Sequence, residues 1–169
     1  MVDQNKIMSL LEEHFQCKGT VKIDDQGQIT VDGNVTLKPT SVIPAEIRFL
    51  EVTGQFVCSN NPQLRSLKGA PHSVGLGFYC VDNPQLESLD GLSQTIGASL
   101  WITYTKTLPL LRALVPTGGV VFWEGRSQSA GDAVKVAAII NQYRGQGQSA
   151  VIICAAELAA AGFKANARW

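Results

Sequence analysis

The stretch that decides the fold runs from Val52 to Gly69 and reads VTGQFVCSNNPQLRSLKG. The chain repeats this stretch from Val74 to Gly91 as VGLGFYCVDNPQLESLDG, so that Val74 corresponds to Val52 and Gly91 to Gly69. Self-similarity at a period of roughly 20 to 50 residues is typical of stacked-repeat folds, in which a unit buries its apolar face only against its neighbours. The sequence therefore predicts a solenoid.

The repeat extends in both directions from this stretch. The spacing between Val52 and Val74, continued toward the C-terminus, aligns Leu100 with Phe78 and Phe122 with Leu100. Toward the N-terminus, a spacing one residue shorter aligns Val35 with Phe56. These alignments predict a third repeat, a last strand around Phe122 without its following turn, and a degenerate first repeat. Each unit is expected to contain a short strand, a turn at Asn-Pro, a return segment with two leucines, and a corner with Gly.

The repeat resembles the leucine-rich repeats, in which alternating apolar residues are followed by an Asn and by further leucines. The resemblance covers about half of the chain and implies a parallel stack with its strands on one side. Two features depart from the family pattern, since aromatic and cysteine residues replace the strand leucines and Pro-Gln follows the Asn. The matching positions are Phe56, Cys58, Asn61, Leu64 and Leu67, and again Phe78, Cys80, Asn83, Leu86 and Leu89.

Different patterns flank the repeats. Asp3 is suited to cap a helix that runs to about Phe15, and alternating apolar residues across 20–37 predict a hairpin that turns at Gly27. After Trp123 the period stops, and apolar residues at helical spacing predict one helix that ends before Gly145 and another across 149–161. Ser129 with Asp132 resembles a capping box for the first of these two helices.

The fold class is therefore predicted as α+β, a short leucine-rich-repeat-like parallel β-solenoid with a helix and hairpin in front and two helices behind. We expect a single domain over residues 1–169. Its parts are an N-terminal helical cap over 1–20, the hairpin and repeats over 21–126, and a C-terminal helical cap over 127–169.

The amino-acid composition limits the classes of partner that the chain is expected to bind. The 14 basic and 14 acidic side chains cancel, so no global field would attract nucleic acid or anionic lipid. No signal peptide is recognisable, and no apolar run reaches the roughly 18 residues of a membrane span. The four cysteines form no C-x-x-C and do not cluster with His14 or His72. We expect a cytosolic protein without metal or cofactor, with no membrane contact and with a nucleic-acid partner disfavoured.

Cys58 and Cys80 fall at equivalent points of adjacent strands, which lie about 4.8 Å apart in a sheet. A disulfide is allowed by that distance. The preferred interpretation is that both are small buried hydrophobic residues of the core.

Strand geometry turns single positions of the repeat into columns. If Phe56 points inward, the residues on either side of it point outward. The outward positions form an aromatic column, and we interpret it and its neighbours as a surface that binds a protein partner. The alternative is that a terminal helix covers the column and makes it part of the core. The predicted binding residues are Val57, Tyr79, Trp101 and Trp123, with Tyr104 close to them and Gln55 and Ser99 beside them.

No catalytic residues are predicted, because His14 and His72 have no recognisable triad spacing. Stacked Asn61 and Asn83 are interpreted as a structural device that satisfies backbone groups. The other polar candidates are better explained by structure than by chemistry: a solvated acidic face of Asp82, Glu87, Asp90 and Glu124, and a frayed tail with Lys164, Arg168 and Trp169.

The predicted function is protein binding without chemistry. The run from Asn141 to Trp169 is similar to the tails of small phage and bacterial repeat proteins. That resemblance implies an inhibitor or adaptor of a host protein, such as a defence nuclease, in the cytoplasm of an infected bacterium. Two alternatives remain: a nucleic-acid-binding or enzymatic module that stacks bases or sugars on the aromatic column, and a structural protein that self-associates through the same face as a homodimer.

Overall fold

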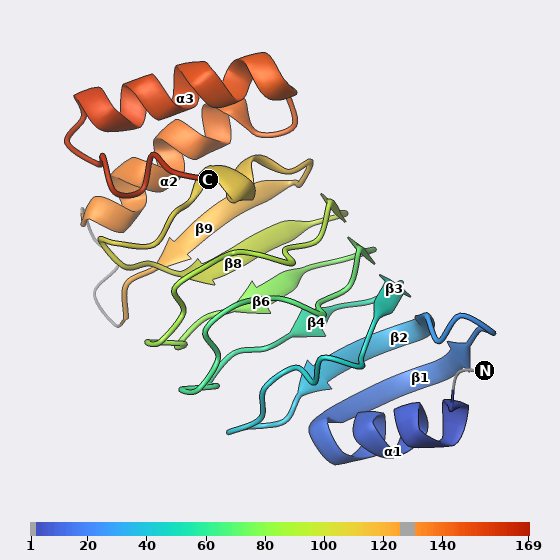
Figure 1. The fold of residues 1–169 in the computed structure, drawn as a ribbon. Coiled ribbons are helices and arrows are strands. Elements are labelled where there is room, and N and C mark those ends of the chain that lie inside the picture. The colour runs from blue at the N-terminus through green and yellow to red at the C-terminus, as the bar shows by residue number, and fades with distance from the viewer. Residues whose placement is uncertain (1–2, 126–130) are drawn as a thin grey trace.

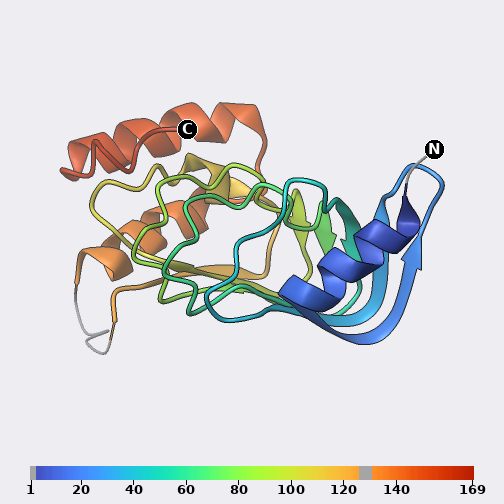
Figure 2. The ribbon, with the colours of Figure 1, turned by 60° about the horizontal axis from the view of Figure 1, so that its bottom comes forward.

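The computed structural model describes residues 3–125 and 131–169, and it is a parallel β-solenoid with helices at both ends (Figure 1). Figure 2 shows the strands gathered in one layer and the return segments in the other. The helices are α1 (Gln4–His14), α2 (Asp132–Tyr143), α3 (Gln148–Ala160) and the short 3-10 helix η1 (Leu111–Leu114). The strands are β1 (Phe15–Ile23), β2 (Ile29–Leu37), β3 (Phe49–Val52), β4 (Phe56–Val57), β5 (Ser73–Val74), β6 (Phe78–Cys80), β7 (Thr95–Ile96), β8 (Ser99–Thr103) and β9 (Gly119–Trp123).

Most coils contribute two short strands instead of the one expected. A bend separates β3 from β4, β5 from β6 and β7 from β8, and the long strand β2 pairs with both β3 and β4. The predicted alignment of the repeats is confirmed through the third repeat. The parallel registers run Val31, Val52, Val74 and Ile96 along one column, and Val35, Phe56, Phe78 and Leu100 along the other.

The last step of the predicted register is wrong. Leu100 pairs with Val120, and Phe122 lies opposite Ile102, so this step is two residues shorter than the step from Phe78 to Leu100. The shorter step falls in the return segment that has lost the Asn-Pro turn, where nothing in the sequence marks a two-residue deletion. Every outward position of β9 is therefore displaced by two residues from its expected neighbour.

Inside the coils, aromatic rings follow one another along the stack. Ring centroids lie 5.2 Å apart for Phe15 and Phe49, 6.0 Å for Phe49 and Phe56, and 5.2 Å for Phe56 and Phe78. These separations suit edge-to-face and tilted aromatic contacts. The leucines of the return segments close the core from the other side, namely Leu64, Leu67, Leu86, Leu89, Leu108 and Leu111.

A ladder of polar side chains crosses the turns that follow the strands. The backbone N–H of Ser41 donates to Asn61 Oδ1 at 3.1 Å, and that of Asn61 donates to Asn83 Oδ1 at 2.8 Å. The N–H of Asn83 in turn donates to Thr103 Oγ1 at 2.9 Å. Asn83 Nδ2 also donates to the carbonyl of Cys58 at 3.0 Å. Both asparagines are fully buried, which confirms their structural interpretation.

The N-terminal cap follows the sequence closely. Asp3 accepts a hydrogen bond from the Lys6 N–H at 3.0 Å, as expected of an N-cap, and Ile7 and Leu11 face the core. The hairpin is longer than predicted, because β1 starts at Phe15, directly after α1, and not near residue 20. No helix within the described residues is long and apolar enough to span a bilayer.

The C-terminal cap differs from the predicted one in two details. Ser129 of the predicted capping box, and the expected boundary at 126/127, lie outside the described residues. Instead, Glu124 Oε2 accepts from the N–H of Ala133 in the first turn of α2, at 3.3 Å. The tail is also not frayed, since the Leu111 N–H donates to the carbonyl of Arg168 at 3.1 Å and the Arg112 guanidinium lies over the Trp169 ring.

We predict that Asn83→Ala lowers the free energy of unfolding by about 2 to 4 kcal/mol, because it leaves the buried N–H of Asn61 without a partner and removes the shorter of two hydrogen bonds to the carbonyl of Cys58. Asn60→Gly is the matched control at a neighbouring turn. Asn60 is exposed and has a φ of 59°, which Gly adopts without strain, so its effect should stay within about 0.5 kcal/mol. Urea denaturation of both variants measures the difference, and equal losses would contradict the role of the ladder.

Candidate binding face

The candidate site is the outer face, defined as the outward side of β4, β6, β8 and β9. Side chains alternate there as predicted: Phe56 and Cys58 are fully buried, Gln55 is exposed and Val57 is half-buried. The helices lie at the two ends of the stack, and α2 packs against β9 (Figure 1). The middle strands of the outer face therefore remain accessible.

Tyr79 and Trp101 form the centre of this face. They are neighbours in the parallel register between β6 and β8, with ring centroids 6.5 Å apart and ring planes inclined by 32°. The Tyr79 ring lies back over Gly77, where an added Cβ would come within 2.6 Å of the ring. Both aromatic side chains are half-buried. They are thus neither core residues nor freely mobile surface groups.

Trp123 does not continue this column, which corrects the predicted arrangement. The shortened last step places Val121 beside Trp101 and pairs Trp123 with Thr103. The Trp123 Nε1–H donates to Asp82 Oδ1 at 2.9 Å. Trp123 and Asp82 border a hollow of about 510 Å³ at the ends of the strands. The contact between Trp123 and Asp82 depends on the shortened step from β8 to β9. Extrapolation of the regular repeat along the sequence could therefore not predict it.

Tyr104 is buried, with only 5% of its surface exposed, and it does not belong to the outer face. Even-numbered residues of β8 point inward, so Tyr104 continues the side of Leu100 and not that of Trp101. Its hydroxyl and Asn166 Oδ1 form a hydrogen bond of 3.3 Å. Burial, followed by the nearby charges of Asp132 and Glu124, raises the pKa of Tyr104 to about 12.

Gln55 and Ser99 flank the aromatic pair at the starts of the strands. Ser99 pairs with Gly119 of β9 and not with Val121, which was the expected neighbour. Gln55 is exposed and Ser99 is half-buried. The strands of the outer face carry no charged residue at all, since they read FV, FYC, SLWIT and GVVFW. The face is apolar and neutral at its centre.

The four acidic residues that could form an edge along the stack each have a partner within the chain. Asp82 accepts from Trp123, and Glu124 accepts from the first turn of α2. Glu87 pairs with an arginine of the preceding return segment, and Asp90 lies 2.7 Å from Arg112. These contacts give the acidic residues structural roles.

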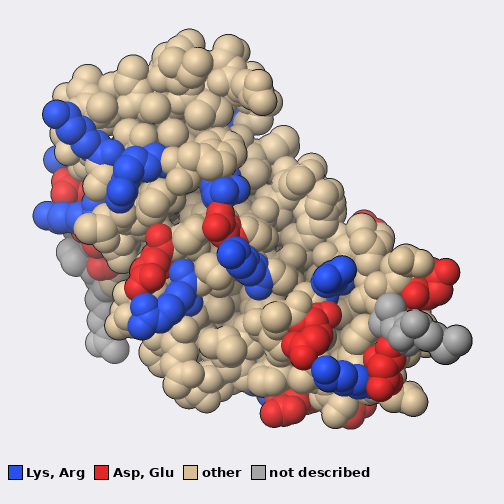
Figure 3. Space-filling model, in the orientation of Figure 1, with Lys and Arg blue, Asp and Glu red and all other residues tan. Residues whose placement is uncertain are grey.

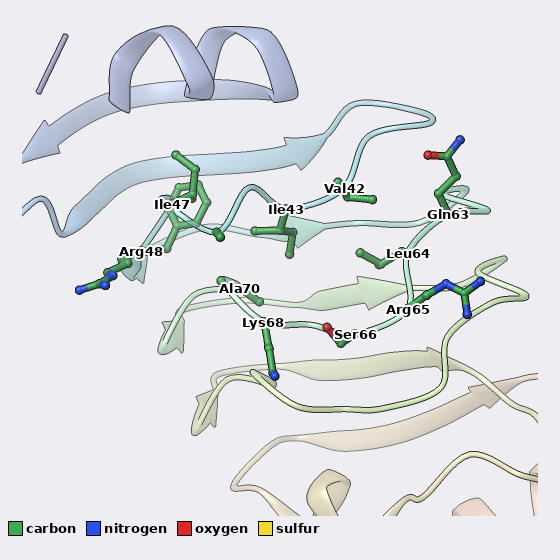
Figure 4. Close-up of a pocket in the computed structure, with 13 residues that line it drawn as sticks. Val42, Ile43, Ile47, Arg48, Gln63, Leu64, Arg65, Ser66, Lys68 and Ala70 are labelled. Carbon is green, nitrogen blue, oxygen red and sulfur yellow. The ribbon is translucent and has the colours of Figure 1, made fainter. Parts of the chain in front are cut away.

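A second hollow, of about 620 Å³, lies between the first two return segments (Figure 4). Its floor is apolar and includes Ile43 and Leu64, while Arg48, Arg65 and Lys68 stand at its rim. Figure 4 shows these three basic side chains pointing in different directions, so they do not converge on one anion. Figure 3 shows acidic and basic side chains interspersed over the same side of the molecule.

The cysteines are all free thiols, and Cys58, Cys80 and Cys154 are fully buried. Burial raises the pKa of the Cys58 thiol well above its usual value, and a hydrogen bond with Cys80 adds to the effect. The preferred interpretation of this pair as core residues is confirmed. Within residues 3–125 and 131–169, no three His, Cys, Asp or Glu side chains are grouped to hold a metal ion.

Comparison of the chain with protein-family models, with curated proteins and with solved structures finds no match. The parallel β-solenoid is shown by the coordinates themselves. The narrower assignment to the leucine-rich repeats receives no support from these comparisons.

Neighbouring residues on opposite faces of β6 provide a test of the outer face. We predict that Phe78→Ala lowers the free energy of unfolding by about 3 to 5 kcal/mol, because it opens a cavity at a fully buried position. Tyr79→Ala should cost about 1 kcal/mol, since its side chain is partly exposed to solvent. Denaturation curves of both variants check the prediction. A Tyr79 loss as large as that of Phe78 would place Tyr79 in the core.

Alkaline pH tests the burial of Tyr104. The phenol of the unfolded chain ionises near the ordinary pKa of 10.0, whereas the folded pKa is about 12. The unfolded state therefore loses this proton first, and stability present below pH 10 falls as the pH rises toward 12. We predict that Tyr104→Phe reduces the decline of the urea midpoint between pH 9 and 11. A decline identical to that of the unmodified protein would contradict the burial of this hydroxyl.

Proposed function

We propose that this chain is a protein-binding module without chemistry, and that the outer face is its binding surface. The observation that carries this proposal is the partly exposed pair of Tyr79 and Trp101 on strands that contain no charge. Aromatic residues are enriched at the centre of protein interfaces, where charged residues are depleted.

The geometry also favours tight contact. The Tyr79 ring already rests on Gly77 and beside Trp101, so little side-chain entropy is lost when a partner covers it. Short parallel strands hold both rings on a rigid backbone. A partner could bury these rings against an apolar surface of its own, with Gln55 and Ser99 as hydrogen-bonding groups at the border.

A nucleic-acid partner is less well supported. Binding to a phosphate backbone depends on lysine and arginine side chains, and β4, β6, β8 and β9 contain neither. Base stacking on Tyr79 and Trp101 alone would lack this electrostatic contribution. The resemblance of the C-terminal run to phage-encoded repeat proteins supports a narrower proposal, in which the partner is a host protein that the chain inhibits or recruits.

The experiment compares capture of partners from a bacterial lysate by three forms of the protein. The unmodified chain is the bait, Tyr79→Ser with Trp101→Ser removes the aromatic pair, and Ile152→Ser changes an equally apolar but distant residue that is 75% exposed. We predict that the double variant binds the captured protein at least about 30-fold more weakly, because the loss of even one such central residue costs about 2 kcal/mol. The Ile152 variant should bind as before.

Three results would contradict the proposal. The first is a captured protein that binds the double variant and the unmodified chain equally well. The second is binding to single-stranded DNA or RNA that weakens with salt and needs Tyr79 and Trp101, which would favour the nucleic-acid alternative. The third is a homodimer in sedimentation experiments that the double variant abolishes, which would assign the face to self-association.

A further inference from the structure

The two ends of the solenoid are closed differently. At the C-terminal end, Asn141 of α2 both accepts from the N–H of Val120 and donates to its carbonyl, each at 2.8 Å. Arg144 Nε donates to the carbonyl of Thr117 at 3.0 Å. Side chains thereby satisfy part of the edge of β9. At the N-terminal end, β1 pairs with β2 only, and no strand of the described residues lies along its other edge.

The hydrogen bonds between β1 and β2 indicate which backbone groups face that open edge. The Lys38 N–H donates to the carbonyl of His14 at 2.8 Å, and the Asp24 N–H donates to the carbonyl of Gln28 at 3.0 Å. In an antiparallel pair, successive residues turn their backbone groups alternately toward and away from the partner strand. Even-numbered residues of β1 therefore face β2, and odd-numbered residues face outward.

The chain itself bonds this outward row only near its two ends. The Phe15 N–H donates to the carbonyl of Leu11. Gln4 Nε2 donates to the carbonyl of Ile23 at 3.3 Å. Within the described residues, no hydrogen bond from outside the β1–β2 ladder reaches the backbone of Cys17, Gly19 or Val21. These five consecutive positions, 17–21, offer about 14 Å of strand edge to a partner, with Gly19 in its middle at a φ of 141°.

An apolar groove accompanies the open edge. It lies between α1 and β1 and has a volume of about 660 Å³. Its apolar lining is Met8, Leu11, Phe15, Cys17 and Val21, and the polar side chains Glu12, Gln16 and Lys38 also border it. Figure 2 shows α1 lying across the inner side of the β1–β2 hairpin, which leaves β1 as the outermost strand. A strand added to β1 would place every second side chain over this groove.

Charge on the other side of β1 limits what can bind. Gln16 lines the groove, but Lys18 and Lys22 do not; both lysines are exposed and form no ion pair within the described residues. A second copy of β1 in antiparallel pairing would bring these lysines together, and like charges across strands are destabilising. Carboxylates at the same positions would be attracted.

We propose that the open edge of β1 binds an extended segment of another protein by strand addition, and that this segment alternates apolar and acidic side chains. The apolar side chains enter the groove beside Met8, and the carboxylates meet Lys18 and Lys22. Backbone hydrogen bonds form with the outward groups of 17–21, as in other cases of β-augmentation. This surface is separate from the outer face and does not depend on the function proposed for it.

A synthetic peptide serves as the probe, namely acetyl-Val-Glu-Val-Glu-Val-Glu-Val-amide. Titrated to several millimolar into isotope-labelled protein, it should shift the NMR amide signals of Cys17, Gly19 and Val21. The matched peptide with Lys in place of Glu should bind at least about tenfold more weakly. The double variant Lys18→Glu with Lys22→Glu should invert this preference, and because both positions are exposed the fold is retained.

Modification of the peptide leaves the protein untouched. Methylation of one alternate set of peptide nitrogens should abolish binding, whereas methylation of the other set should leave it intact, because only one set faces β1. Cys17 adds a second readout. It is half-buried while the other cysteines are fully buried, so alkylation at Cys17 should slow when the acidic peptide is present.

The proposal is overturned by any of several results. These are equal binding of the acidic and basic peptides, equal tolerance of both methylation sets, and signal changes confined to the outer face around Tyr79 and Trp101. Absence of binding at several millimolar peptide, or a concentration-dependent dimer that protects Cys17 without peptide, also overturns it.

Discussion

Hydrogen bonding from one coil to the next is the constraint on which the rest of this structure depends. Each short strand of the stack is only a few residues long and is stabilised by its neighbours, so the register between coils must hold at every step. Asn61 and Asn83 extend this bonding into the turns, where the backbone leaves the strand and would otherwise bury unpaired groups. Where the repeat loses its asparagine, Thr103 accepts the corresponding bond.

The same register arranges the two faces of the sheet. Because equivalent residues stack at each step, one inward position becomes the packed rings of Phe56 and Phe78, and one outward position becomes the pair of Tyr79 and Trp101. The inner row stabilises the fold through burial. The outer pair is held by the same backbone but remains partly exposed to solvent, which is why its rings are available for the proposed protein contact.

The ends of the stack show how the constraint is met when the strands run out. The cap at the C-terminal end uses Asn141 and Arg144 to bond the last backbone groups, whereas β1 at the other end keeps an open row over 17–21. Lysines on an edge strand discourage pairing between identical chains. The same positive charge attracts acidic side chains. In our proposal, Lys18 and Lys22 therefore oppose pairing of β1 with a second copy of itself and attract the acidic segment.

The sequence by itself determined the solenoid, the alignment of its repeats through the third, the buried asparagines and the end helices, because each of these follows from local patterns repeated along the chain. Tertiary structure alone decided the rest. The shortened step to β9 moved Trp123 out of the column and onto Asp82. The open edge of β1 likewise became visible only in three dimensions. Such features depend on backbone pairing between distant segments. A deletion within a loop changes that pairing, and the repeat pattern of the sequence does not reveal the change.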